Sequence, residues 1–180
     1  LSRRLDAPLL AAGYSRLLID LNRPLEAPDS IPPHSEVYPV PGNRELSETV
    51  RRYRQDCLFH PFHQRLTQLL DERQAAGVPP RVVGVHSFTP LYHGRPRPLV
   101  AGVLYRNAGA YARRILDGLR RHGLEVAGNQ PYAIDPAEDT TVPVHGDARG
   151  LEAVLLEIRN DGLRTPDAVY AWAERLYPWL

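Results

Sequence analysis

Polar side chains able to do chemistry stand at three short apolar runs of the sequence. The segment Asp20–Arg23 follows one run, His86 follows the next, and Glu157 lies inside the third. Runs of four to six apolar residues predict buried strands, and open α/β sheets place their sites outside the carboxyl ends of strands. We therefore expect these groups to line a common crevice.

His86 and Glu157 offer complementary chemistry. Neutral imidazole at a strand end is a common zinc ligand, although a partly buried histidine without a ligand role is the alternative. A carboxylate in so apolar a run costs several kcal/mol unless it is paired or its pKa is raised. A raised pKa suits a general base, whereas pairing with Arg159 would give Glu157 a structural role.

Five further side chains are weaker candidates. Arg16 and Arg23 carry planar, permanently charged forks that suit a carboxylate or an oxyanion, and a structural salt bridge is the open alternative. His145 follows Val-Pro-Val and could donate a hydrogen bond or occupy a turn. His60 and His63 are spaced to chelate a metal, but the intervening Pro61 favours packing.

These residues must be positioned by alternating strands and helices. Such alternation predicts an α/β fold with a mixed, mostly parallel sheet and helices on both faces, in one domain over residues 1–180. A helix interruption is expected near Pro61, and the proline-rich residues 24–43 predict a long ordered loop. The expected strands are 9–12, 17–21, 81–88, 100–105, 124–126 and 153–158, and the expected helices are 1–5, 47–77, 108–122 and 166–180.

Composition excludes several partners. With 22 basic and 21 acidic residues the formal charge is +1, so the chain has no net field to hold nucleic acid. No apolar run approaches the roughly 20 residues that cross a bilayer. Cys57 is the single cysteine, which excludes an intrachain disulfide and a cysteine-based zinc site and favours the cytoplasm.

Motifs spread along the chain together resemble the N-formylglutamate amidohydrolase family. They occur in family order over nearly the whole length, which is far more specific than one short motif. The motifs are Tyr14–Pro24, Ala27–Pro32, Pro41–Asn43, Val85–Pro90, Gly102–Tyr105, Asn129–Tyr132, Val142–Gly146 and Glu157–Asp161.

The resemblance implies a fold like that of zinc carboxypeptidases and aspartoacylases, a zinc-exopeptidase-like (phosphorylase/hydrolase-like) architecture. It also implies zinc-dependent hydrolysis of a small N-acyl acidic amino acid, such as N-formyl-glutamate to glutamate and formate. A zinc ion with three protein ligands keeps one position for water and lowers the pKa of that water to about 7.

The same resemblance gives roles to individual residues. Asn22 and Arg23 would hold the substrate carboxylate, with Tyr105 and His145 as further substrate-binding residues. Arg16 would polarise the scissile carbonyl, His86 would be a zinc ligand, and Glu157 would be the general base.

One part of the family pattern is missing. Two further zinc ligands would come from a Glu-His segment near the family's amino terminus, and no Glu-His pair occurs here. The chain also has no methionine, so we expect it to be N-terminally truncated, to bind metal weakly and to be inactive alone. Two alternatives stay open: a zinc deacylase for another acyl group, and a non-catalytic carboxylate-binding module. The sequence does not indicate an oligomeric state.

Overall fold

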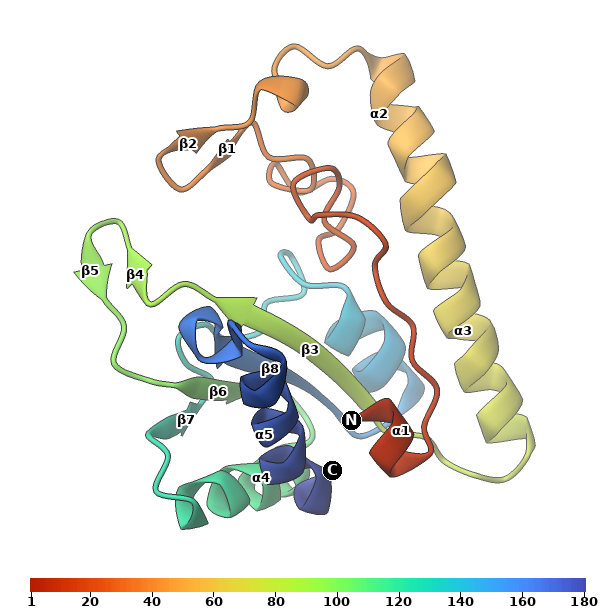
Figure 1. The fold of residues 1–180 in the computed structure, drawn as a ribbon. Helices are drawn as coiled ribbons and strands as arrows, with labels where there is room; N and C mark the ends of the chain where they lie inside the picture. The colour runs from red at the N-terminus through yellow and green to blue at the C-terminus, as the bar shows by residue number, and fades with distance from the viewer.

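A four-stranded sheet forms the centre of the computed structural model, which describes residues 1–180 (Figure 1). The strand order is β3-β8-β6-β7. β3 (Val82–Phe88) pairs with β8 (Ala153–Arg159) in parallel, and β6 (Ala101–Leu104) pairs with β7 (Val126–Gly128) in parallel. Only β6 and β8 are antiparallel. The expected mixed, mostly parallel sheet is confirmed.

Helices cover both faces of the sheet, as expected. α4 (Gly109–Arg121) and α5 (Pro166–Leu176) pack on one face, where they share a core of 14 buried residues with β6, β7 and β8. The π-helix η3 (Thr141–Gly146) and α3 (His60–Ala75) contribute to a second core of 8 buried residues on the other face. Because β8 is covered on both faces, its sequence reads as a continuous apolar run, interrupted only by Glu157.

The helix interruption expected near Pro61 takes the form of a change in helix type. α2 (Glu48–Arg54) passes into a π-helical segment, η2 (Gln55–Phe59), and α3 follows directly, so that one long rod stands beside the sheet in Figure 1. Pro61 lies in the first turn of α3, where its missing N–H is best tolerated. Ser47 caps α2 by accepting from the backbone N–H of Val50.

The remaining elements are short. α1 packs close to α5, where Arg4 Nε lies 2.9 Å from Glu174 Oε1, and Thr165 caps α5 as predicted. No helix is both long and apolar enough to cross a membrane. The short elements are α1 (Ser2–Leu5), β1 (His34–Ser35), β2 (Tyr38–Pro39), η1 (Pro41–Asn43), β4 (Leu91–Tyr92), β5 (Arg95–Pro96), η4 (Asp147–Arg149), η5 (Asn160–Leu163) and η6 (Tyr177–Trp179).

The strands predicted within residues 9–21 do not form. Residues 9–12 are irregular and largely exposed, with Leu9 74% exposed, so the prediction of a buried strand there is wrong. Residues 13–21 form bends and turns, and of the run 17–21 Ile19 is buried with Ile31 and Phe59. Side-chain hydrogen bonds to the backbone compete with strand pairing here. Ser15 Oγ accepts from the backbone N–H of Leu17, and Asp20 Oδ1 accepts from the backbone N–H of Asn22. Residues 17–21 therefore form a partly buried loop that packs against η2 through Ile19 and Leu21.

Gly102 in β6 is a position where the fold requires a glycine. A Cβ there would overlap the carbonyl oxygen of Gln130, which passes over the sheet. We expect Gly102→Ala to destabilise the chain by about 1–3 kcal/mol, because backbone must move to admit the methyl group. Urea unfolding measures this. Gly13→Ala, which places a Cβ in open space, is the control; equal losses in both variants would contradict the prediction.

Candidate active site

His86 and Glu157 are direct neighbours on the two parallel strands β3 and β8. Paired residues in a sheet project from the same face, so the imidazole and the carboxyl group lie side by side. His86 Nδ1 is 4.0 Å from Glu157 Oε1, too far for a hydrogen bond. Both groups therefore keep hydrogen-bonding atoms for something else.

Glu157 is a buried acid without the structural partner that the sequence allowed. It is 7% exposed, and its Oε2 is buried without a hydrogen bond. Arg159 pairs instead with Asp161, at 2.9 Å. Burial raises the pKa of Glu157 to about 7, with the negative charge of Asp139 adding to the rise and the nearby arginines, Arg97 foremost, opposing it. A carboxyl group with this pKa can take up and release a proton near neutral pH.

The His86 imidazole is half-buried and held in its neutral form. Burial lowers its pKa, and the negative charges of Asp20 and Asp139 oppose that effect. A neutral imidazole has a nitrogen lone pair for a metal or a hydrogen bond.

Arg16 and Arg23 both lie near this pair, since their charges influence the pKa values of His86 and Glu157. Arg16 Nε is 2.9 Å from Asp20 Oδ2. Arg23 Nε is 2.9 Å from Asp29 Oδ2, and its Nη1 donates to a backbone carbonyl. The structure thus brings together the three groups at positions 23, 86 and 157, with Arg16 at their edge.

Asn22 is occupied by contacts within the chain. Its Nδ2 donates to Asp139 Oδ1 at 2.8 Å, and its Oδ1 accepts from the backbone of Thr141 at 3.0 Å. Its backbone carbonyl also accepts from Thr140. In this conformation Asn22 ties the loop that carries Arg23 to the loop that carries Asp139, and a substrate carboxylate would have to displace these bonds to reach it.

Tyr105 is not brought to this site. β6 runs antiparallel to β8, and Gly102 rather than Tyr105 lies opposite Glu157. Tyr105 is three residues beyond Gly102, a distance of roughly 10 Å along a strand. Because side chains alternate between the two faces of a strand, a residue three positions away projects from the opposite face. The Tyr105 ring lies against Gly109 and Gly128 and packs on the core of α4.

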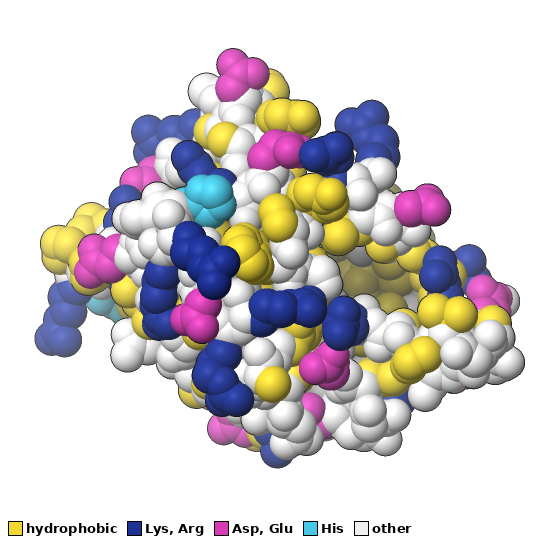
Figure 2. Space-filling model, turned by 90° about the horizontal axis from the view of Figure 1, so that it is seen from below, with side chains coloured by type: hydrophobic (Ala, Val, Ile, Leu, Met, Phe, Trp, Pro, Cys, Tyr) yellow, Lys and Arg dark blue, Asp and Glu magenta, His cyan; other side chains and the backbone are white.

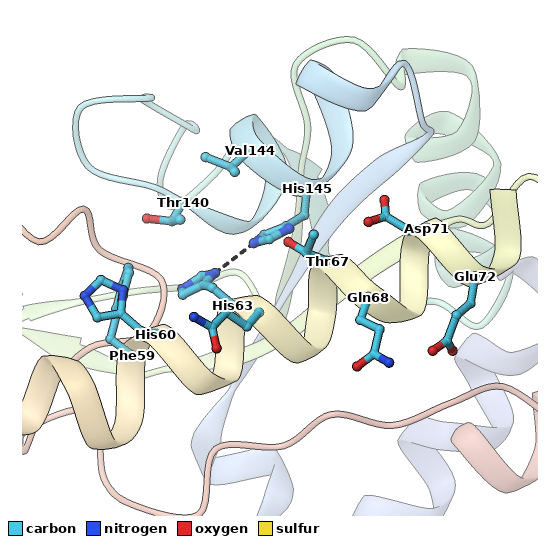
Figure 3. Close-up of a pocket in the computed structure, with 11 residues that line it drawn as sticks. Phe59, His60, His63, Thr67, Gln68, Asp71, Glu72, Thr140, Val144 and His145 are labelled. Carbon is cyan, nitrogen blue, oxygen red and sulfur yellow. Dashed lines mark hydrogen bonds between the residues drawn. The ribbon is translucent and has the colours of Figure 1, made fainter. Parts of the chain in front are cut away.

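His145 lies in the wall of a separate cavity of about 620 Å³ between α3 and η3 (Figure 3). Neither His86 nor Glu157 lines it. The rings of His63 and His145 are stacked at 5.0 Å, and His63 Nδ1 is 2.7 Å from His145 Nε2. Burial, with the charge of His63, lowers the pKa of His145 to about 4.

The His63–His145 pair reaches the candidate site through one backbone group. His63 Nε2 lies 2.9 Å from the carbonyl oxygen of Leu21 and so donates to it. With both rings neutral, His63 Nδ1 then accepts from His145 Nε2. The pair therefore fixes the backbone directly between Asp20 and Asn22, which gives His63 the role of a positioning residue rather than that of a metal chelator with His60.

Replacing His63 by phenylalanine tests that role. Phenylalanine keeps an aromatic ring at this position but cannot make the hydrogen bonds to His145 and to the Leu21 carbonyl. The Leu21 carbonyl is then left without its donor. We expect a loss of about 1–3 kcal/mol in the free energy of unfolding, measured in urea. His60→Phe is the matched control, because His60 is exposed and only approaches Asp56 at 3.9 Å. A loss as large in the control would contradict the assignment.

The residues described do not by themselves complete a zinc site. No group of three or more histidine, cysteine, aspartate or glutamate side chains converges in residues 1–180 as a metal site would require. His86 offers one imidazole whose pKa is lowered by burial. A zinc ion at this place would therefore need ligands beyond His86.

The sequence did not predict two residues of the site. Asp139 lies in the irregular stretch before η3, and Arg97 follows the β4–β5 hairpin in an Arg-Pro-Arg-Pro segment. Both influence the pKa of Glu157. No periodic pattern marks either one; the nearest signal is the Asn129–Tyr132 motif, whose Tyr132 contacts Arg97.

Comparisons with known proteins agree with this fold. A gene product from Agrobacterium tumefaciens, known from a crystal structure, is 39% identical in sequence and superposes with a TM-score of 0.93. The match spans 99% of this chain and 71% of the Agrobacterium chain. The N-formylglutamate amidohydrolase from Ralstonia eutropha JMP134, also known from a crystal structure, is 20% identical in sequence and shares the fold with a TM-score of 0.65. This match spans 91% of this chain and 70% of the Ralstonia chain. No curated protein matches the sequence. The family model described as N-formylglutamate amidohydrolase matches residues 1–163, and the chain therefore belongs to that family.

Proposed function

We propose that the protein hydrolyses the amide of an N-acyl acidic amino acid, with N-formyl-glutamate as substrate and glutamate and formate as products. The observation that carries the proposal is Glu157: a buried carboxyl group with a free Oε2, beside a neutral imidazole and within the field of three arginines. Family membership supports an amidohydrolase, and the Ralstonia neighbour bears the name of this activity.

The proposed roles follow from the charges and hydrogen-bonding atoms of these side chains. Arg23 binds a substrate carboxylate, because a guanidinium fork matches its two oxygens. Arg16 donates to the scissile carbonyl as negative charge develops there. Glu157 takes a proton from the attacking water and returns it to the leaving nitrogen, which a pKa of about 7 allows.

The proposal includes zinc, with His86 as one ligand. When bound, zinc supplies a water of lowered pKa and polarises the carbonyl. Because residues 1–180 offer no further convergent ligands, we expect these residues alone to bind zinc weakly and to release no formate. Cys57, exposed and unpaired, fits the proposed cytoplasmic setting.

Formate release tests the function. The complete gene product with zinc is expected to release formate from N-formyl-L-glutamate, to lose this activity with a chelator and to regain it with Zn²⁺. The same assay on residues 1–180 is expected to stay at the buffer rate. A panel of N-formyl, N-acetyl and N-succinyl glutamate identifies the acyl group. Binding of these compounds without any release by the complete product would instead favour a non-catalytic carboxylate-binding module.

A further inference from the structure

The guanidinium group of Arg97 is held among aromatic rings on the edge of the candidate site. Its Cζ lies 4.3 Å from the ring centre of Tyr92, 4.9 Å from that of Tyr132 and 5.7 Å from that of Phe88. Its Nη1 donates to the Tyr132 hydroxyl at 2.6 Å. Cation–π contacts with these rings hold the guanidinium in place and leave its remaining N–H groups free for a carboxylate.

Arg97 differs from the other arginines of the site in having no carboxylate partner within 4.0 Å. Arg16 is paired with Asp20, Arg23 with Asp29 and Arg159 with Asp161. The backbone of Arg97 is fixed, since its N–H donates to Pro90 and its carbonyl accepts from Arg159. A half-buried cation that is anchored, stacked and unpaired has the properties of an anion-binding group.

Contacts with two aromatic rings, Phe88 and Tyr132, place this cation on the face of the sheet that carries His86 and Glu157. Phe88 lies two residues after His86 on β3, so both side chains project from the same face. Tyr132 follows Gln130, whose carbonyl lies over Gly102, the residue paired with Glu157. Arg97 contacts both aromatic rings and therefore lies over the same end of the sheet as the proposed base.

We propose that Arg97 is a specificity-determining residue that binds one of the two carboxylates of a dicarboxylic N-acyl amino acid, while Arg23 binds the other. This inference rests on the proposed function and deepens it: the site selects acidic over neutral amino-acid derivatives. Tyr92, Tyr132 and Phe88 hold the guanidinium in place, so little side-chain entropy is lost when the carboxylate binds.

Equilibrium binding to residues 1–180, which contain all of these groups, tests the proposal by isothermal titration calorimetry. The ligands are N-formyl-L-glutamate, N-formyl-L-glutamine and N-formyl-L-isoglutamine, which carry both carboxylates, only the α-carboxylate and only the γ-carboxylate. We expect Arg97→Gln to raise Kd about tenfold or more for the dicarboxylate and for one monocarboxylate. Its Kd for the other monocarboxylate, which lacks the group that Arg97 binds, should change by less than about twofold.

Arg95→Gln is the matched control, because Arg95 is an exposed arginine of the same hairpin and should leave all three Kd values unchanged. Arg97→Lys keeps the charge without the planar fork and should fall between the wild type and Arg97→Gln. An equal effect of Arg97→Gln on all three ligands, or no effect, would overturn the inference while the proposed function stands. A wild-type chain that binds none of the three would contradict the proposed function itself.

Discussion

Glu157→Gln is expected to stabilise the metal-free chain by about 3 kcal/mol at pH 8. The pKa of Glu157 is raised from 4.5 to about 7, chiefly by burial, so the ionised carboxylate opposes folding above pH 7. Glutamine has the same shape and no charge to desolvate. The gain should shrink to less than about 1 kcal/mol at pH 5, where the folded protein already holds the carboxyl group in its neutral form.

The direction of this pH dependence follows from the proton count. Between pH 4.5 and about 7 the folded chain binds a proton at Glu157 that the unfolded chain has released, so wild-type stability falls as pH rises through this window. Urea unfolding of both variants at pH 5 and pH 8 measures the difference. Glu152→Gln is the control: this exposed glutamate precedes the same strand and pairs with Arg81, and its removal should stabilise the chain at neither pH.

The same substitution is expected to abolish most catalysis. Removal of a general base typically costs 10²- to 10⁴-fold in rate, so the complete gene product with Glu157→Gln should release formate at least about 100 times more slowly than the wild type. A variant that gains stability at pH 8 while losing turnover would identify Glu157 as a group kept for function at a cost to folding. Unchanged turnover would remove Glu157 from the mechanism.

Arg23→Gln is expected to weaken binding of N-formyl-L-glutamate to residues 1–180 by about 10- to 100-fold. The fork of Arg23 would lose its charged hydrogen bonds to the ligand carboxylate, which contribute about 1.5–3 kcal/mol. Titration calorimetry gives the change in Kd. The loss should appear for the dicarboxylate and for the one monocarboxylate that Arg97→Gln leaves unaffected.

A matched control separates ligand binding from loop anchoring. Arg23 also holds its own loop through Asp29, at 2.9 Å, and through the carbonyl of Glu138. Asp29→Asn weakens that anchoring and keeps the guanidinium, so it should change Kd by less than about threefold. If Asp29→Asn weakened binding as much as Arg23→Gln, Arg23 would be a structural residue only.

The sequence predicted the strands and helices that have strong periodic patterns. The two strands that carry His86 and Glu157 are among those predicted correctly. The apolar runs around His86 and Glu157 became β3 and β8, and their parallel pairing set the two side chains together. The run at residues 17–21 was buried but did not form a strand, because local side-chain hydrogen bonds favoured turns. The run at residues 9–12 formed neither a strand nor part of the core, since Leu9 is 74% exposed.

The residues that the sequence did not reveal depend on long-range contacts. The antiparallel direction of β6 turned Tyr105 away from the site, and nothing local in its short run encodes that direction. Arg97 reaches the site through rings at positions 88, 92 and 132, and Asp139 reaches it through Asn22. Mixed charges are interspersed over the face shown in Figure 2, so a functional arginine does not stand out by its type alone.

The position of bound N-formyl-L-glutamate is the most direct test of whether residues 23, 86 and 157 form one functional site. A crystal structure of residues 1–180 soaked with this compound should show a carboxylate on the Arg23 guanidinium and the formyl group between His86 and Glu157. Density in the 620 Å³ cavity beside His63 and His145, with no ligand atom in contact with Glu157, would contradict the proposed site.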